Sequence, residues 1–142
     1  MKINGFTLVE LLVVISIIGI FAGIALIALA GAREAARDTR RKADLEQIRS
    51  GIELYRADCQ DYPSTLSSSL KGDGSPPTCS TTNTYIESVS KDPQDPLRIY
   101  RYSRVTATTY ELCVALEQGG GTVTCGGSSN CGQPCNFKVT NP

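Results

Sequence analysis

The chain has 142 residues, and its 14 basic and 14 acidic side chains give a formal net charge of zero. This balance gives no electrostatic reason to expect a nucleic acid or another polyanion as partner. The chain has no histidine, which removes the commonest general base and metal ligand, and its six cysteines behind an apolar segment indicate an oxidising compartment.

The most distinctive stretch of the sequence is the apolar segment of residues 5–32, in which Glu10 is the only charged residue. As a helix, residues 11–32 would cover about 33 Å, which matches the ~30 Å hydrocarbon core of a bilayer. A helix that is apolar on every side belongs in lipid or in the packed core of a larger assembly. The sequence therefore predicts one membrane-spanning helix, residues 6–32.

The residues around the start of this helix form a motif. Lys2 precedes Gly5, and Phe6-Thr7-Leu8-Val9-Glu10 follows. This pattern resembles the type IV prepilins and the pseudopilins of type II secretion. The resemblance implies that residues 1–5 are a leader peptide, that a prepilin peptidase cuts after Gly5, and that the new amine of Phe6 is methylated. It also implies an α+β pilin-like fold, in which a long N-terminal helix packs on a small antiparallel sheet.

The resemblance also implies a role for Glu10 in assembly. A carboxylate within an apolar membrane segment is costly unless it finds a partner. In this family the amine of one subunit is thought to meet the glutamate of a neighbour, and opposite charges attract strongly where little solvent screens them. We therefore expect Glu10 to pair with the Phe6 amine of a neighbouring subunit. The alternative is that the side chain of Glu10 extends to the lipid headgroups at the membrane surface.

Two glycines, Gly19 and Gly23, form a G-x-x-x-G pattern inside the apolar helix. Small residues at this spacing let helix backbones approach closely, so both are candidate assembly residues. Taken alone, the pattern is weak, because two glycines in a long apolar segment arise easily by chance.

A secretory signal peptide is the rival interpretation of the apolar segment. Ala28-Leu29-Ala30 fits an A-x-A cleavage site, and cleavage there would release a small secreted domain. Against this, the apolar run is longer than a usual signal core of about 7–15 residues, and Glu10 would be unusual in it. The flanking charges leave the orientation of the helix ambiguous, whereas the cysteines favour an external C-terminal domain.

Residues 33–58 are predicted to be the amphipathic half of the same helix, because no proline interrupts residues 6–57. Such a helix would be about 78 Å long. Leu45, Ile48, Ile52 and Tyr55 recur at three- and four-residue steps and form one apolar stripe. The early charged residues are interpreted as a solvated face, or alternatively as contacts with lipid headgroups or neighbouring subunits: Arg33, Glu34, Arg37, Asp38, Arg40, Arg41 and Asp44.

Residues 59–142 are predicted to form a globular head domain. Residues 59–84 are rich in Ser, Thr, Pro and Gly and predict loops. Residues 97–105 and 109–117 predict the two strands of a hairpin, and residues 136–139 predict a last edge strand. In the second hairpin strand, the alternation places Tyr110, Leu112, Val114 and Leu116 inward and Thr109, Glu111 and Glu117 outward.

All six cysteines lie in the head: Cys59, Cys79, Cys113, Cys125, Cys131 and Cys135. A zinc site would call for C-x-x-C pairs or histidines, which the sequence lacks, so structural disulfides are expected. Six cysteines allow fifteen pairings. Nearness in sequence suggests Cys59–Cys79 and a further link among Cys125, Cys131 and Cys135.

The segment of residues 91–96 resembles an acidic, proline-bearing segment that lies near a calcium site in major pseudopilins. Asp92 and Asp95 are weak calcium candidates, because they are only two carboxylates and calcium takes six to eight oxygens; the alternative is a rigid surface turn. The sequence offers no nucleophile–base pair, no phosphate-binding loop and no redox C-x-x-C. We therefore expect no enzymatic activity and no cofactor.

Together these features predict a structural subunit of a type IV pilus-like filament. It would be anchored in a bacterial membrane with its C-terminal domain outside, and would then polymerise with copies of itself into an extracellular filament. The implied partners are the prepilin peptidase and methyltransferase, an assembly platform with its ATPase, and membrane lipid. The alternatives are a pseudopilin of a type II secretion system and a secreted or membrane-anchored disulfide-rich binding domain.

Overall fold

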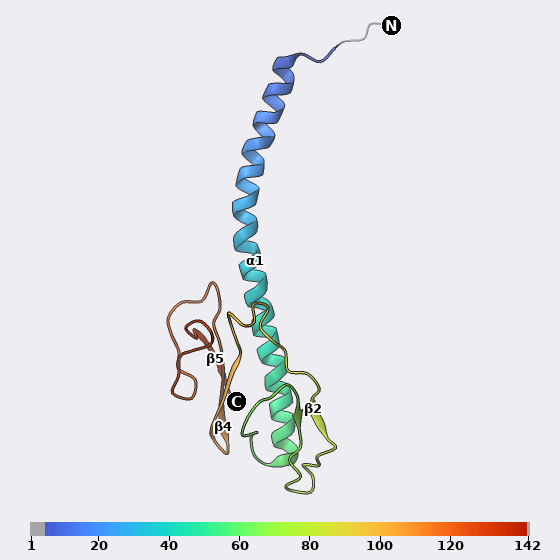
Figure 1. The fold of residues 1–142 in the computed structure, drawn as a ribbon, viewed down its shortest axis with the longest axis vertical. Coiled ribbons are helices and arrows are strands. Elements are labelled where there is room, and N and C mark those ends of the chain that lie inside the picture. The colour runs from blue at the N-terminus through green and yellow to red at the C-terminus, as the bar shows by residue number, and fades with distance from the viewer. Residues whose placement is uncertain (1–4, 142) are drawn as a thin grey trace. The chain divides into compact units, whose positions relative to one another are not determined.

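The computed structural model describes residues 5–141, so residues 1–4 of the predicted leader lie outside the described residues. One helix and five strands follow in chain order (Figure 1): α1 (Leu8–Cys59), β1 (Leu70–Lys71), β2 (Thr84–Ile86), β3 (Arg101–Thr106), β4 (Thr109–Val114) and β5 (Phe137–Thr140). A long helix combined with small antiparallel sheets is the α+β pilin-like arrangement that the sequence predicted.

The helix α1 is continuous over 52 residues. It begins at Leu8, two residues after the expected start, and it ends at Cys59, one residue after the expected end. The chain divides into two compact units, residues 1–36 and residues 37–142, and α1 contributes to both. The head therefore includes the charged turn that begins at Arg37, within the segment that the sequence assigned to the amphipathic half of the helix.

The core of the head forms around the apolar stripe of α1. Leu45, Ile48 and Ile52 are at most 1% exposed, which confirms the predicted stripe. They share one hydrophobic cluster with the inward-facing residues of β4, which include Leu112. Gly51 has a specific role here, because a Cβ at this position would lie 2.3 Å from the side chain of Ile86. The glycine thus permits the close approach of β2 to the helix.

The main sheet has the order β3-β4-β5, with both pairs antiparallel. The predicted hairpin and the predicted last edge strand are therefore present. Strand β3 begins at Arg101 and not at Leu97, which is 67% exposed. The preceding residues form a turn in which the amide of Leu97 donates to the carbonyl of Gln94 at 2.8 Å, so this part of the apolar-looking run does not join the sheet.

Both faces of β4 are buried. Tyr110, Leu112 and Val114 belong to the core that includes the helix, whereas Cys113 belongs to a second cluster with Ala115 and three cysteines of the C-terminal loops. The disulfides are Cys59–Cys79, Cys113–Cys125 and Cys131–Cys135, so no cysteine is free. The first pairing agrees with the one suggested by sequence proximity. The carboxylate of Asp73 lies beside it, but the two sulfurs are bonded to each other and are not available to a metal.

A second sheet, β1-β2, begins in the region that the sequence assigned to loops, residues 59–84, which contains β1 and the first residue of β2. Leu70 pairs with Ile86, and both side chains are buried in the main core. The loop prediction was wrong here, because strands of two and three residues are too short to show an alternating pattern.

Candidate functional site

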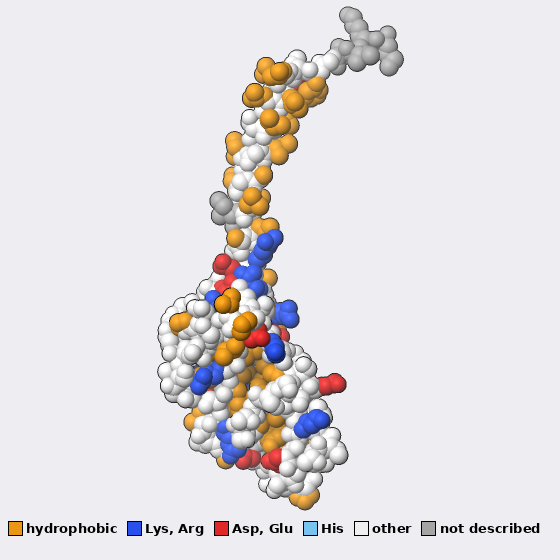
Figure 2. Space-filling view, in the orientation of Figure 1, with side chains coloured by type: hydrophobic (Ala, Val, Ile, Leu, Met, Phe, Trp, Pro, Cys, Tyr) orange, Lys and Arg blue, Asp and Glu red, His pale blue; other side chains and the backbone are white. Residues whose placement is uncertain are grey.

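The first part of α1 exposes its hydrophobic side chains (Figure 2). Their exposed fractions run from 46% to 79%, although such residues are usually buried. By length and composition this helix is able to cross a membrane. So large an apolar surface calls for lipid or for the helices of neighbouring subunits. The exposed residues are Phe6, which precedes the helix, and Leu8, Val9, Leu11, Leu12, Val13, Val14, Ile15, Ile17, Ile18, Ile20, Phe21, Ile24, Leu26 and Leu29 within it.

Glu10 caps the N-terminus of its own helix. One carboxylate oxygen of Glu10 accepts hydrogen bonds from the backbone N–H of Thr7 at 2.9 Å and from its hydroxyl at 2.7 Å. In return, the amide of Glu10 donates to the Thr7 hydroxyl at 3.3 Å. This is a reciprocal capping box, and its T-x-x-E signature could have been found in the sequence. Glu10 is exposed and so is accessible to a partner from another chain.

The other predicted processing and assembly residues are also accessible. Gly5 and Phe6 are exposed and precede the helix, so the peptide bond between them lies outside regular structure. Gly19 and Gly23 lie inside the helix, and a Cβ at either position would meet no atom within 4 Å. The flat surface at the two glycines is therefore open to the backbone of another helix.

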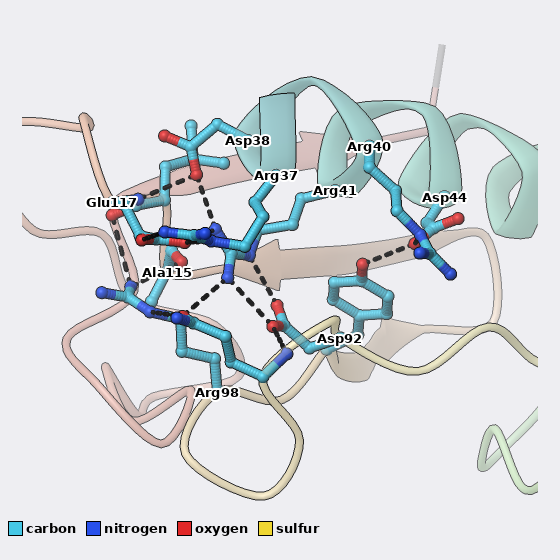
Figure 3. Close-up of polar contacts among 12 residues, drawn as sticks. Arg37, Asp38, Arg40, Arg41, Asp44, Asp92, Arg98, Ala115 and Glu117 are labelled. Carbon is cyan, nitrogen blue, oxygen red and sulfur yellow. Dashed lines mark hydrogen bonds and ion pairs between the residues drawn. The ribbon is translucent and has the colours of Figure 1, made fainter. Parts of the chain in front are cut away.

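A cluster of charged residues lies where the head begins (Figure 3). Its centre is Arg41, whose side chain has no exposed surface. Arg41 donates to both carboxylate oxygens of Asp92, at 2.8 and 3.1 Å, to Asp38 at 2.7 Å and to Glu117 at 2.6 Å. A fifth hydrogen bond, 3.0 Å long, goes to the side-chain oxygen of Gln94. The cluster thus joins α1 to the turn before β3, which contains Asp92 and Gln94, and to Glu117, which follows β4.

Hydrogen bonds of Asp38 connect the cluster to the backbone of the head, and Glu117 binds a second arginine. Asp38 accepts hydrogen bonds from the backbone amides of Glu117 and Gln118, at 2.9 and 2.8 Å. Glu117 receives a second arginine, because Arg37 donates to its two oxygens at 2.7 and 2.5 Å. These contacts fix the chain immediately after the central strand against the first head turn of α1.

The electrostatics of the cluster follow from these contacts. The hydrogen bond from Arg37, together with Arg41, lowers the pKa of Glu117 to about 2. Burial opposes ionisation of Asp38, but the amides of Gln118 and Glu117 and the charge of Arg41 outweigh it and lower its pKa. Burial also opposes the charge on Arg41, yet its three carboxylate partners raise its pKa overall. The charges of Glu117, Asp38 and Arg41 therefore persist at neutral pH.

Two sequence interpretations are wrong at this cluster. Arg41 and Asp38 do not belong to a solvated face, since Asp38 is only 6% exposed and Arg41 is fully buried. Glu117 does not point outward into solvent either, because its side chain is 11% exposed and turned toward the two arginines. A signal was present: Arg41 lies four residues before Leu45 and so continues the apolar stripe by one helical turn.

Acid should weaken the head through this cluster. A carboxyl group whose pKa is lowered by folding stabilises the folded state above its unfolded pKa, and this contribution is lost as the pH falls toward the folded value. For Glu117 the window runs from 4.5 down to about 2. Thermal unfolding of the full chain in detergent should therefore show a falling melting temperature across this range. Glu117→Gln should be less stable at neutral pH and should show a flatter pH dependence; an unchanged slope in this variant would contradict the assignment.

The calcium candidates do not come together as a cation site. Asp92 is buried and uses both oxygens for Arg41, and one of them also accepts from the amide of Gln94 at 2.8 Å. Asp95 has a 37% exposed side chain and lies 3.8 Å from the ammonium group of Lys91. The donors around Asp92 are cationic and amide N–H groups, and both of its oxygens are engaged by them. Asp92 and Asp95 therefore do not share a site in the part of the chain that the structure describes.

Comparison with known proteins gives two matching families. The model described as the prokaryotic N-terminal methylation motif matches residues 1–26, and the model described as type II secretion system (T2SS), protein G, matches residues 28–124. The second match covers the amphipathic half of α1 and most of the head, including the whole Arg41 cluster.

Individual relatives agree with these matches. The type II secretion system core protein G of Escherichia coli (strain K12) is 33% identical over 97 residues, which are 65% of this chain and 67% of the relative. The proteins of the same name from Pectobacterium carotovorum and Pseudomonas aeruginosa are 37% and 36% identical over 62 residues. These two matches span 44% of this chain and 40% and 44% of the relatives. No solved structure matches the chain.

Proposed function

Since this chain belongs to the family of type II secretion system protein G, we propose that it is a pseudopilin, the subunit of a short filament in a type II secretion system. The observation that carries this proposal is the match over residues 28–124. The N-terminal motif alone suits pilins and pseudopilins equally, whereas this match lies in the part of the chain that differs between them. We therefore favour a pseudopilin over the surface pilus subunit that was the first expectation from the sequence.

The proposed mechanism starts in the membrane. The apolar helix anchors the processed subunit, with the disulfide-bonded head outside. An assembly platform and its ATPase then move subunits from lipid into a helical filament, in which the exposed apolar side chains pack against those of other copies. The chain supplies the packing surface, and the motor is a separate protein.

Secretion assays separate this function from that of a pilus. Deletion of the gene in its host should stop the release of secreted proteins into the medium and leave surface pili intact, and the intact gene should restore release. Normal release accompanied by loss of surface pili or of twitching would favour the pilus instead.

Cleavage and methylation of the N-terminus are expected independently of the role in secretion. A prepilin peptidase and methyltransferase should give a mature chain that begins at Phe6 with a methylated amine, as the match to the N-terminal methylation motif suggests. Mass spectrometry of the mature N-terminus checks this directly. A chain that begins at Gly31, after Ala30, would identify the apolar segment as an ordinary signal peptide and would exclude assembly through α1.

A further inference from the structure

Each cysteine of the head pairs with its neighbouring cysteine along the chain. The partners are separated by 20, 12 and 4 positions, and no other cysteine lies between any two partners. Six cysteines allow fifteen pairings, and this is the only one in which every bond joins consecutive cysteines. Each bond is therefore able to close before the next pair of cysteines emerges from the membrane.

Nearness along the chain does not by itself select this pairing. Cys125 lies six residues from Cys131 but twelve from Cys113, which is its partner. Because a shorter loop costs less entropy to close, a chain with all its thiols free at once would favour Cys125–Cys131 over the native bond. The order of emergence gives the opposite preference, since Cys113 and Cys125 both leave the membrane before Cys131. Order therefore explains a pairing that loop length does not.

The sulfurs are protected once the head has folded. Cys59 is 4% exposed, and the other five cysteines have no exposed surface. No cysteine is free, so the chain holds no thiolate that could begin an exchange. Backbone hydrogen bonds also hold the C-terminal pair, because the amides of Ile99 and Val123 donate to the carbonyls of Cys131 and Cys135 at 2.8 and 2.7 Å. The bonds must therefore form correctly before the head closes.

We propose that a thiol-oxidising enzyme with a reactive disulfide acts on the head as it emerges, and that the order of emergence sets the pairing without a disulfide isomerase. The proposal rests on the external head of the proposed function. For each bond, one cysteine thiolate attacks the disulfide of the enzyme, and the second thiolate then displaces the enzyme from the mixed disulfide. Two electrons and two protons of the cysteine pair reduce the enzyme to its dithiol. Oxidation thus precedes assembly.

Mass spectrometry of non-reduced peptides tests the proposal on the full chain, produced in its host and alkylated at harvest to stop exchange. The parent strain is compared with a strain that lacks the disulfide oxidase and with one that lacks the isomerase. Without the oxidase, the fraction of chains with all three native bonds should fall at least several-fold. Without the isomerase, this fraction should equal that of the parent. A fall without the isomerase, or no fall without the oxidase, would overturn the proposal.

A matched pair of variants tests the order of emergence. Cys79→Ser leaves Cys59 without its partner, so Cys59 next meets Cys113, and the bond Cys113–Cys125 should now require the isomerase. The double variant Cys59→Ser/Cys79→Ser lacks the same bond but keeps the remaining cysteines consecutive, so it should stay independent of the isomerase. If both variants behave alike, the folded head selects the pairing and the proposal is overturned. These covalent readouts do not depend on the secretion assay, which tests the pseudopilin function separately.

Discussion

Glu10→Ala should give normal membrane insertion and normal cleavage after Gly5, yet few or no filaments and little secretion. If Glu10 pairs with the amine of a neighbouring subunit, its loss strands a cation in an apolar environment. Breaking a buried ion pair costs on the order of 3–5 kcal/mol, and in a filament the loss recurs at every subunit. An isolated acid in lipid would behave in the opposite way, because its removal makes the segment more apolar and favours insertion.

The capping box gives Glu10 a second role, which must be separated from the first. Glu10→Gln keeps a side chain that suits the capping box but removes the charge, so it should fail nearly as badly as Glu10→Ala. Thr7→Val removes the hydroxyl that bonds to Glu10 and keeps the charge. It should cost about 1 kcal/mol of helix capping and leave assembly close to wild type. Cleavage of each variant is measured alongside secretion, in cells without the native copy.

The comparison of these variants decides the role of Glu10. Wild-type secretion from both Glu10 variants would remove the residue from the assembly mechanism. A Thr7→Val variant as defective as Glu10→Gln, with normal cleavage, would reassign Glu10 to capping alone.

Asp92→Ala should be among the most destabilising single substitutions in the head. It leaves the buried guanidinium of Arg41 with two of its donors unpaired, and it removes the acceptor of the Gln94 amide. Loss of one partner from a buried pair costs about 3–5 kcal/mol. Denaturant unfolding of the full chain in detergent measures this difference.

Asp95→Ala is the matched control for Asp92→Ala. Asp95 lies three residues further along the same segment, but its side chain is partly exposed and its ion pair with Lys91 is 3.8 Å long. Its loss should change the free energy of unfolding by no more than about 0.5 kcal/mol. Equal and large effects at both positions would contradict the burial and pairing of Asp92 and would support a shared site for the two carboxylates.

The elements with a long repeating pattern could be predicted from the sequence. The helix was found because an apolar segment and a stripe at 3.6-residue spacing meet without an intervening proline, and the hairpin was found because Tyr110, Leu112 and Val114 alternate. The strands β1 and β2 were not predicted, because strands of two and three residues are too short to show a repeating pattern. The pairing of Cys113 with Cys125 was missed too, since it depends on which loop covers the second face of β4.

Only part of the candidate site could be predicted from the sequence. The N-terminal motif indicates where assembly takes place, because its chemistry depends on residues that are adjacent in the sequence. The Arg41 cluster joins residues 38, 41, 92, 94 and 117, which only the folded head brings together. Charged residues on early helical turns usually face solvent, so their burial could be inferred only from the continuation of the apolar stripe.

Electron microscopy of filaments assembled from this subunit tests the central claim most directly. When the chain is overproduced together with its secretion machinery, we expect helical filaments whose subunits begin at Phe6. Residues 6–32 should lie packed around the filament axis, with Glu10 of one subunit at the N-terminal amine of another. A chain that stays monomeric in the membrane, or filaments in which the apolar helix lies outside the core, would contradict assembly through α1.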